Sequence, residues 1–136
     1  MSCYWDNSAL INALLSPAVM VRLKKEGGVS RSHTLAEFFG TMTGRGIETA
    51  PGQRLKLDPS AAAQWLNRIA KFLTWHDLSA AEVLSELQQT RARNVMGARV
   101  HDYLHAAAAV AAHADKILTR DQDFANLGFN IKAEKP

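Results

Sequence analysis

Four acidic residues stand where a protein could gather carboxylates around a metal ion: Asp6, Glu37, Asp102 and Asp121. Asp6 and Asp121 each follow a short apolar run that is typical of a buried strand. We expect Glu37 in the first turn of the helix after the second strand, and Asp102 near the start of a long helix. Ligands of open parallel sheets bind beyond the carboxyl ends of the strands, so these positions predict that the acids meet at one sheet edge.

Carboxylates that converge without cations repel one another, and each raises the pKa of its neighbours. Such a cluster makes physical sense chiefly around a hard divalent cation, which binds oxygen ligands and keeps several of its waters. Mg²⁺ or Mn²⁺ fits this description, and either ion activates water and stabilises charge on a phosphodiester during hydrolysis. The acids therefore predict metal-dependent cleavage of a nucleic acid backbone.

Each acid also has a purely structural explanation. Asp6 could cap the first helix, Glu37 could form a capping box with Thr34, and Asp121 or Asp123 could cap a C-terminal turn. Asp102 could be a solvated residue near the start of its helix, although Asp is a poor residue for a helix interior. Sequence spacing alone does not decide between these explanations and a shared site.

The segments that must position the acids alternate in type. Strands are expected at residues 3–5, from residue 29, at 72–77 and at 116–119. Helical spacing of apolar residues predicts helices around 10–15, from about 34 to 42, from 59 to 72, from 79 to 87 and from 100 to 111. Residues 43–58 are expected to form an exposed loop, and 91–97 a basic connection. This alternation predicts an α/β fold in which helices flank a central, mainly parallel sheet.

Four short motifs, in order along nearly the whole chain, carry a resemblance to a known family. They are WDNSAL at 5–10, SHTLAEF at 32–38, HDYLHA at 101–106 and LTRDQDF at 118–124. With these motifs the chain resembles PIN-domain ribonucleases, and more narrowly the VapC-type toxins of bacterial toxin–antitoxin pairs. The resemblance implies a single PIN-like domain over residues 1–136. The loop at 43–58 departs from the family pattern but contains none of the matched motifs.

The resemblance also implies roles for individual residues and partners. The metal-binding acids would be Asp6, Glu37, Asp102 and Asp121, with Ser8 and Thr119 as hydroxyls near the metal or its waters, and Asp123 sharing or replacing the role of Asp121. The implied reaction is in-line attack by a metal-activated water on RNA, which leaves a 5′-phosphate. The implied partners are an RNA substrate such as tRNA or another structured RNA, a cognate antitoxin and a second copy of the chain.

Composition narrows the class of protein further. The chain has 136 residues and a net charge of +3, which permits binding to a polyanion without requiring it. Cys3 is the only cysteine, so an intramolecular disulfide and a Cys-rich zinc site are excluded. With no signal-like or membrane-spanning apolar segment, we expect a cytoplasmic protein.

Two other functions compete with the nuclease. A receiver domain that accepts phosphate on Asp77 would fit the length and the alternation, although the acid doublet expected after the first strand is missing. A module that keeps the fold but only binds RNA or acts as a scaffold is the second alternative, because fold alone does not establish function.

Other conspicuous side chains have structural explanations as well. We expect His101 and His105 to be solvated or hydrogen-bonded structural residues. The arginines that could bind phosphate near the site are Arg91, Arg93, Arg99 and Arg120, although basic residues in connections are usually solvated. The aromatic residues expected to pack in the core are Trp5, Trp65, Trp75, Phe38 and Phe39. Some apolar residues of the first two helices are expected to stay exposed in a monomer.

Overall fold

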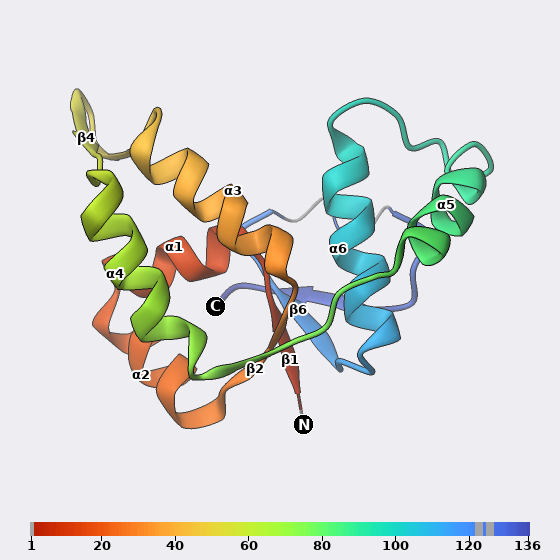
Figure 1. Cartoon of the computed structure of the whole chain (residues 1–136), viewed down its shortest axis with the longest axis horizontal. Coiled ribbons are helices and arrows are strands. Elements are labelled where there is room, and N and C mark those ends of the chain that lie inside the picture. The colour runs from red at the N-terminus through yellow and green to blue at the C-terminus, as the bar shows by residue number, and fades with distance from the viewer. Residues whose placement is uncertain (1, 122–123, 125–126) are drawn as a thin grey trace.

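A computed structural model describes residues 2–121, 124 and 127–136 of the chain, and within these residues a five-stranded sheet forms its centre (Figure 1). Its strands are β1 (Cys3–Trp5), β2 (Gly28–Ser30), β5 (Leu73–Trp75), β6 (Lys116–Leu118) and β7 (Lys132–Glu134). They lie in the order β5-β2-β1-β6-β7, and all four neighbouring pairs are parallel. The expected α/β class with a parallel sheet flanked by helices is therefore confirmed.

The strand order places a crossover beside β1. From β1 the chain builds outward through β2 to β5, and then returns to the other side of β1 with β6 and β7. The helices that follow neighbouring strands on either side of such a switch diverge, which opens a crevice at the carboxyl ends of the two strands. Here the crevice lies beyond Trp5 and Leu118, which are paired in register.

The helices cover both faces of the sheet, with α1 to α4 on one side and α5 and α6 on the other (Figure 1). Their bounds are α1 Asn7–Leu15, α2 Pro17–Glu26, α3 Ser32–Thr43, α4 Pro59–Ala70, α5 Ala80–Gln89 and α6 Arg99–Ala111. The alternation of side chains along β1 separates two apolar clusters, because Cys3 and Trp5 pack with the first group of helices and Tyr4 with α6. The four consecutive alanines at 106–109 are all buried and bring α6 close to the sheet.

A glycine at position 28 is required where β1 meets β2. Its φ is 143°, and a Cβ atom added there would lie 2.3 Å from the carbonyl oxygen of Cys3 and 2.8 Å from Nε1 of Trp5. The indole N–H of Trp5 donates to the carbonyl of Gly27 at 2.9 Å in the same place. Any larger side chain at Gly28 would therefore separate the two strands.

Residues 43–58 differ from the expected loop. They continue α3 to Thr43 and then form an antiparallel hairpin of β3 (Ile47–Ala50) and β4 (Gln53–Leu55). The turn consists of Pro51 and Gly52, with Gly52 at a φ of 78°, which is the pattern of a type II turn rather than of the Asn-Gly turns usual in hairpins. The prediction of an irregular loop was wrong because this turn signal is weaker.

Two further elements were not predicted. The segment after α1 forms a second helix, α2, since Ser16 caps it through its side chain and Pro17 fits the first helical position. At the other end of the chain β7 extends the sheet next to β6, although its Lys-Ala-Glu sequence has no strand-like apolar pattern. Among the described residues, no helix is both long and apolar enough to span a membrane.

Candidate functional site

The four predicted acids lie on elements that end or begin at the crevice beside β1. Asp6 follows β1, and Asp121 lies three residues beyond the end of β6. Asp102 lies in the first turn of α6, as predicted. Glu37 lies in the second turn of α3 and not in the first, because α3 already begins at Ser32, where Asp77 accepts a hydrogen bond from the backbone N–H.

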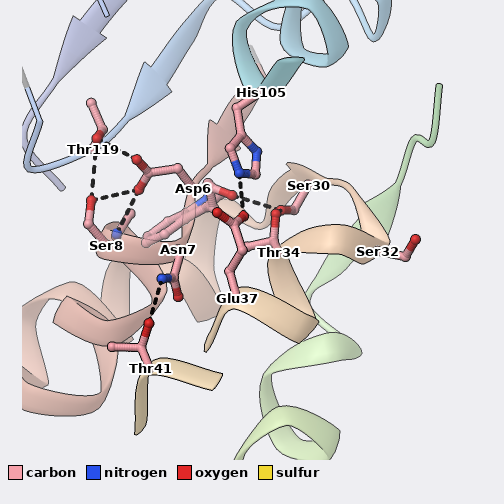
Figure 2. Close-up of polar contacts among 12 residues, drawn as sticks. Asp6, Asn7, Ser8, Ser30, Ser32, Thr34, Glu37, Thr41, His105 and Thr119 are labelled. Carbon is pink, nitrogen blue, oxygen red and sulfur yellow. Dashed lines mark hydrogen bonds and ion pairs between the residues drawn. The ribbon is translucent and has the colours of Figure 1, made fainter. Parts of the chain in front are cut away.

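Asp6 is buried in a network of hydrogen bonds (Figure 2). Its Oδ1 accepts from the hydroxyl of Ser8 at 2.8 Å and from the backbone N–H of Ala9 at 2.9 Å, and its Oδ2 accepts from the hydroxyl of Thr119 at 2.5 Å. The bond to Ala9 is the helix cap that was considered as the structural explanation. Capping α1 and facing the crevice are therefore two properties of the same carboxylate.

The hydroxyls of Ser8 and Thr119 also fix the chain after β6. The oxygen of Ser8 accepts from the backbone N–H of Arg120 at 2.9 Å, and the oxygen of Thr119 accepts from the backbone N–H of Asp121 at 3.0 Å. Each hydroxyl thus donates to Asp6 and accepts from the segment that carries Asp121. Asp123, the alternative to Asp121, lies outside the described residues.

Glu37 is held by a second chain of polar side chains (Figure 2). Its Oε1 lies 2.5 Å from Nε2 of His105, whose Nδ1 lies 2.6 Å from the hydroxyl of the buried Tyr4. Burial by itself would raise the pKa of Glu37, but the hydrogen bond and charge of His105, with smaller effects of His33 and Arg31, bring the pKa below its usual value. Glu37 is therefore held as a carboxylate facing α6.

Asp102 has the opposite electrostatic surroundings. Burial raises its pKa most, and the negative charges of Asp121, Asp6 and Glu37 add to the rise, so that the pKa reaches about 6 even though His105 opposes it. All three other predicted acids thus act on Asp102. The four carboxylates are therefore coupled electrostatically through Asp102.

The burial of Asp6 has a related effect. Desolvation raises its pKa despite the three hydrogen bonds from Thr119, Ala9 and Ser8, which favour the charged form. A divalent cation would relieve both this penalty and the repulsion at Asp102. The donor set of oxygen atoms suits Mg²⁺ or Mn²⁺ and not a thiolate-binding metal.

The side chains do not form a closed cage for an ion. Among residues 2–121, 124 and 127–136, no three His, Cys, Asp or Glu side chains are placed so that they could hold a metal ion directly. Mg²⁺ usually keeps several waters and is held in proteins by one or two carboxylates, so a carboxylate cluster without a cage still fits this ion.

A groove adjoins the acids on the side of the β3–β4 hairpin. It has a volume of about 630 Å³, and it is lined by Ser8, Ile11, Asn12, Leu15, Ile47, Glu48, Thr49 and Arg120. Arg120 lies in its wall and donates to Oδ1 of Asn12 at 2.8 Å. Because Ser8 contacts both the groove and Asp6, the groove leads directly to the acid cluster.

Several side chains have roles that the sequence analysis left open or did not predict. His105 is a buried, hydrogen-bonded residue, as one of the two expectations had it, but its pairing with Tyr4 and Glu37 spans 101 and 68 residues of sequence. Among the basic candidates, Arg93 packs over the rings of Tyr103 and Phe129 and so has a structural role. Thr34 lies inside α3, so the capping box with Glu37 that was considered as a structural explanation does not form.

The aromatic predictions were mostly confirmed. Trp5 and Phe38 are fully buried, and Trp65 and Trp75 pack against the same apolar cluster. Phe39 is exposed, against expectation, because neighbouring helical residues point about 100° apart and Phe38 already faces the core. Some apolar residues of the first helices also remain exposed, as predicted; Leu15 and Val21 are examples.

No protein-family model matches the chain, and no curated protein matches it either.

Proposed function

We propose that the protein is an Mg²⁺- or Mn²⁺-dependent endoribonuclease. The proposal is carried by the grouping of four carboxylates at the crevice, where burial, and after it the negative charges of Asp121, Asp6 and Glu37, raise the pKa of Asp102 to about 6. A protein that keeps such a cluster loses stability unless a cation binds there, so the cluster itself argues for an ion-dependent function. The ion would supply activation of a water molecule and neutralisation of charge on a phosphodiester.

The residues of the site would have different roles. Asp6, Glu37, Asp102 and Asp121 would hold the ion directly or through its waters. Ser8 and Thr119 would keep Asp6 oriented, since both donate to its carboxylate. Asp123 would share or replace the role of Asp121 in holding the ion.

The groove beside the acids supports a nucleic acid substrate. Its volume is large enough for a nucleotide, and its wall combines apolar side chains with polar groups, the negative charge of Glu48 and the positive charge of Arg120. Arginine suits phosphate because its guanidinium offers several donors in one plane. We infer that a single strand or an unpaired loop of RNA lies along the groove, and tRNA or another structured RNA would supply such loops.

A role as the toxin of a toxin–antitoxin pair extends the proposal to partners. The exposed apolar side chains of the first three helices, Leu15, Val21 and Phe39, would be covered by a second copy of the chain or by a small antitoxin. A cytoplasmic location belongs to the same proposal.

One alternative retains support. A module that binds RNA without cutting it would agree with the lack of a closed cage of ligands among the described residues. The receiver alternative has little support, because Asp77 follows the edge strand β5 and its Oδ1 already accepts two hydrogen bonds from Ser32. The strand order also differs from the 2-1-3-4-5 order of receiver-like folds.

The test is cleavage of a pool of tRNAs and other structured RNAs by the purified protein with Mg²⁺, with Mn²⁺ and with EDTA. We expect cutting only with a metal, and none from Asp102→Asn. Asp115→Asn is the matched control, because this exposed acid precedes β6 and so lies at the opposite edge of the sheet. RNA that is bound but never cut with either metal would favour the binding module.

A further inference from the structure

Arg31 is a buried arginine without a partner. Only 7% of its surface is exposed, and its Nε atom is enclosed without any hydrogen bond. Among the described residues, no carboxylate forms an ion pair with its guanidinium. A buried cation is costly unless it is paired, so an unpaired guanidinium in this position indicates a site prepared for an anion.

The surroundings of Arg31 place this guanidinium beside the acid cluster. Its charge adds to the effect of His105 in lowering the pKa of Glu37, adds to the effect of burial in lowering the pKa of His33, and counteracts the rise in the pKa of Tyr4 that burial causes. It is also the N-cap residue of α3, so the positive end of the helix dipole lies next to it. Arg31 therefore lies within electrostatic reach of Glu37, and also of Asp77, whose pKa it lowers in addition to the hydrogen bonds from Ser32.

Two exposed imidazoles complete this cluster, which consists of Arg31, His33 and His101 and which we call the cationic cluster after its guanidinium. The rings of His33 and His101 stack at 5.6 Å between centroids with an angle of 9° between their planes. His33 also lies 6.4 Å from the ring of His105, which holds Glu37. The three side chains come from the start of α3 and the start of α6, the two helices that carry Glu37 and Asp102.

We propose that the cationic cluster binds a backbone phosphate of the RNA strand next to the phosphate at the acid cluster. This inference rests on the proposed nuclease function and names the path of its substrate. A guanidinium and imidazole N–H groups are the donors that recognise phosphate oxygens, and the acid cluster alone would repel a polyanion. The strand would then pass from the groove of Arg120, across the acids, to the cationic cluster.

Binding without cleavage tests the cluster separately from the nuclease. The probe is a labelled five-nucleotide single-stranded RNA, titrated in EDTA so that no metal takes part. We expect Arg31→Met to weaken binding about tenfold and to reduce the slope of log K against log salt concentration by about 0.7, the value for one phosphate contact of a single strand. Arg68→Met, which removes an exposed arginine from α4, is the control for a general loss of charge.

A second variant covers the case in which Arg31→Met does not fold. His33→Gln combined with His101→Gln changes two exposed side chains, and we expect it to weaken binding about threefold or more through the loss of hydrogen bonds. His76→Gln combined with His113→Gln is its control. If both cluster variants bind the RNA as tightly as the unchanged protein does, the proposal is wrong, whether or not the protein cleaves RNA.

A titration with inorganic phosphate tests whether the cluster binds a phosphate of an RNA backbone or a free phosphate ion. Imidazole NMR signals of His33 and His101 should shift on addition of the RNA and stay in place at the same concentration of inorganic phosphate. Shifts with inorganic phosphate alone would mean a site for the free anion and would overturn the assignment to an RNA backbone. If instead the proposed nuclease function is wrong, the RNA will bind through the cluster but will not be cut with Mg²⁺ or Mn²⁺.

Discussion

The two halves of the acid cluster differ in how their carboxylates are held. Asp6, beside β1 and β6, has both oxygens occupied by hydrogen bonds from Ser8, Ala9 and Thr119. Asp102, at the start of α6, receives no hydrogen bond from any described residue, and burial together with the charges of the other acids raises its pKa to about 6. The first half is fixed before any ion arrives, whereas the second keeps a repulsion that an ion would remove.

Because Asp6 and Asp102 are held differently, a substitution at either acid should affect the stability of the fold differently from a substitution at the other. Where hydrogen bonds hold a carboxylate, removing it leaves donors unpaired and the fold weaker. Where burial and like charges outweigh the favourable contacts of a carboxylate, removing its charge relieves the fold. Substitutions in the two halves should therefore have the same effect on cleavage and opposite effects on unfolding.

Asp6→Ala should have the largest effect. It removes the cap of α1 and leaves the hydroxyls of Ser8 and Thr119 without their acceptor, so we expect the free energy of unfolding to fall by about 2 kcal/mol. Cleavage should fall to the background level. Urea denaturation and the RNA assay measure the two quantities, and a variant as stable as the unchanged protein would contradict the importance of this network.

Asp102→Asn should also abolish cleavage but stabilise the metal-free protein. The folded-state pKa of Asp102 is raised, so the unchanged protein loses stability as the pH rises from about 4 through about 6, while Asn stays neutral. After allowance for solvent screening at this half-buried group, we expect a gain of about 1 kcal/mol at pH 8. The gain should vanish at pH 3 and shrink when Mg²⁺ is added. If Asp102→Asn were less stable than the unchanged protein at pH 8, the proposed difference between Asp6 and Asp102 would be wrong.

Thr119→Val tests how strongly the fixed position of Asp6 depends on the hydroxyl groups that donate to it. The change keeps the shape of the side chain but removes the donor to Asp6 and the acceptor for the N–H of Asp121. We expect a loss of about 1–2 kcal/mol of stability and a decrease of about 10- to 100-fold in cleavage. Thr74→Val, at an exposed residue of β5, is the matched control and should leave cleavage unchanged.

Tyr4→Phe should have the smallest effect. It removes the hydroxyl that contacts Nδ1 of His105 and leaves the bond between His105 and Glu37 in place. We expect about a tenfold decrease in cleavage and about 1 kcal/mol of lost stability. A KM that stays constant while kcat falls would indicate a positioning role, whereas loss of stability alone would indicate simple packing.

Local pattern in the sequence accounted for much of the fold. The apolar runs at β1 and β6, the proline and Asp58 before α4, and the capping box of Ser79 and Glu82 all act through neighbouring residues. Such signals predicted where these elements begin. The hairpin of β3 and β4 escaped prediction because its Pro51-Gly52 turn is also compatible with a loop.

The candidate site could be predicted only in part. The sequence alone identified the acids, and the parallel sheet explains why residues after β1 and β6 meet, since the two strands are neighbours. The tertiary structure alone decided that Tyr4 and His105 hold Glu37, that Asp77 caps α3, and that β7 pairs with β6. These contacts join residues far apart in the chain, so no local spacing specifies them. The unpaired state of Arg31 is likewise a property of the packed fold, because only packing decides which charges lie within reach of one another.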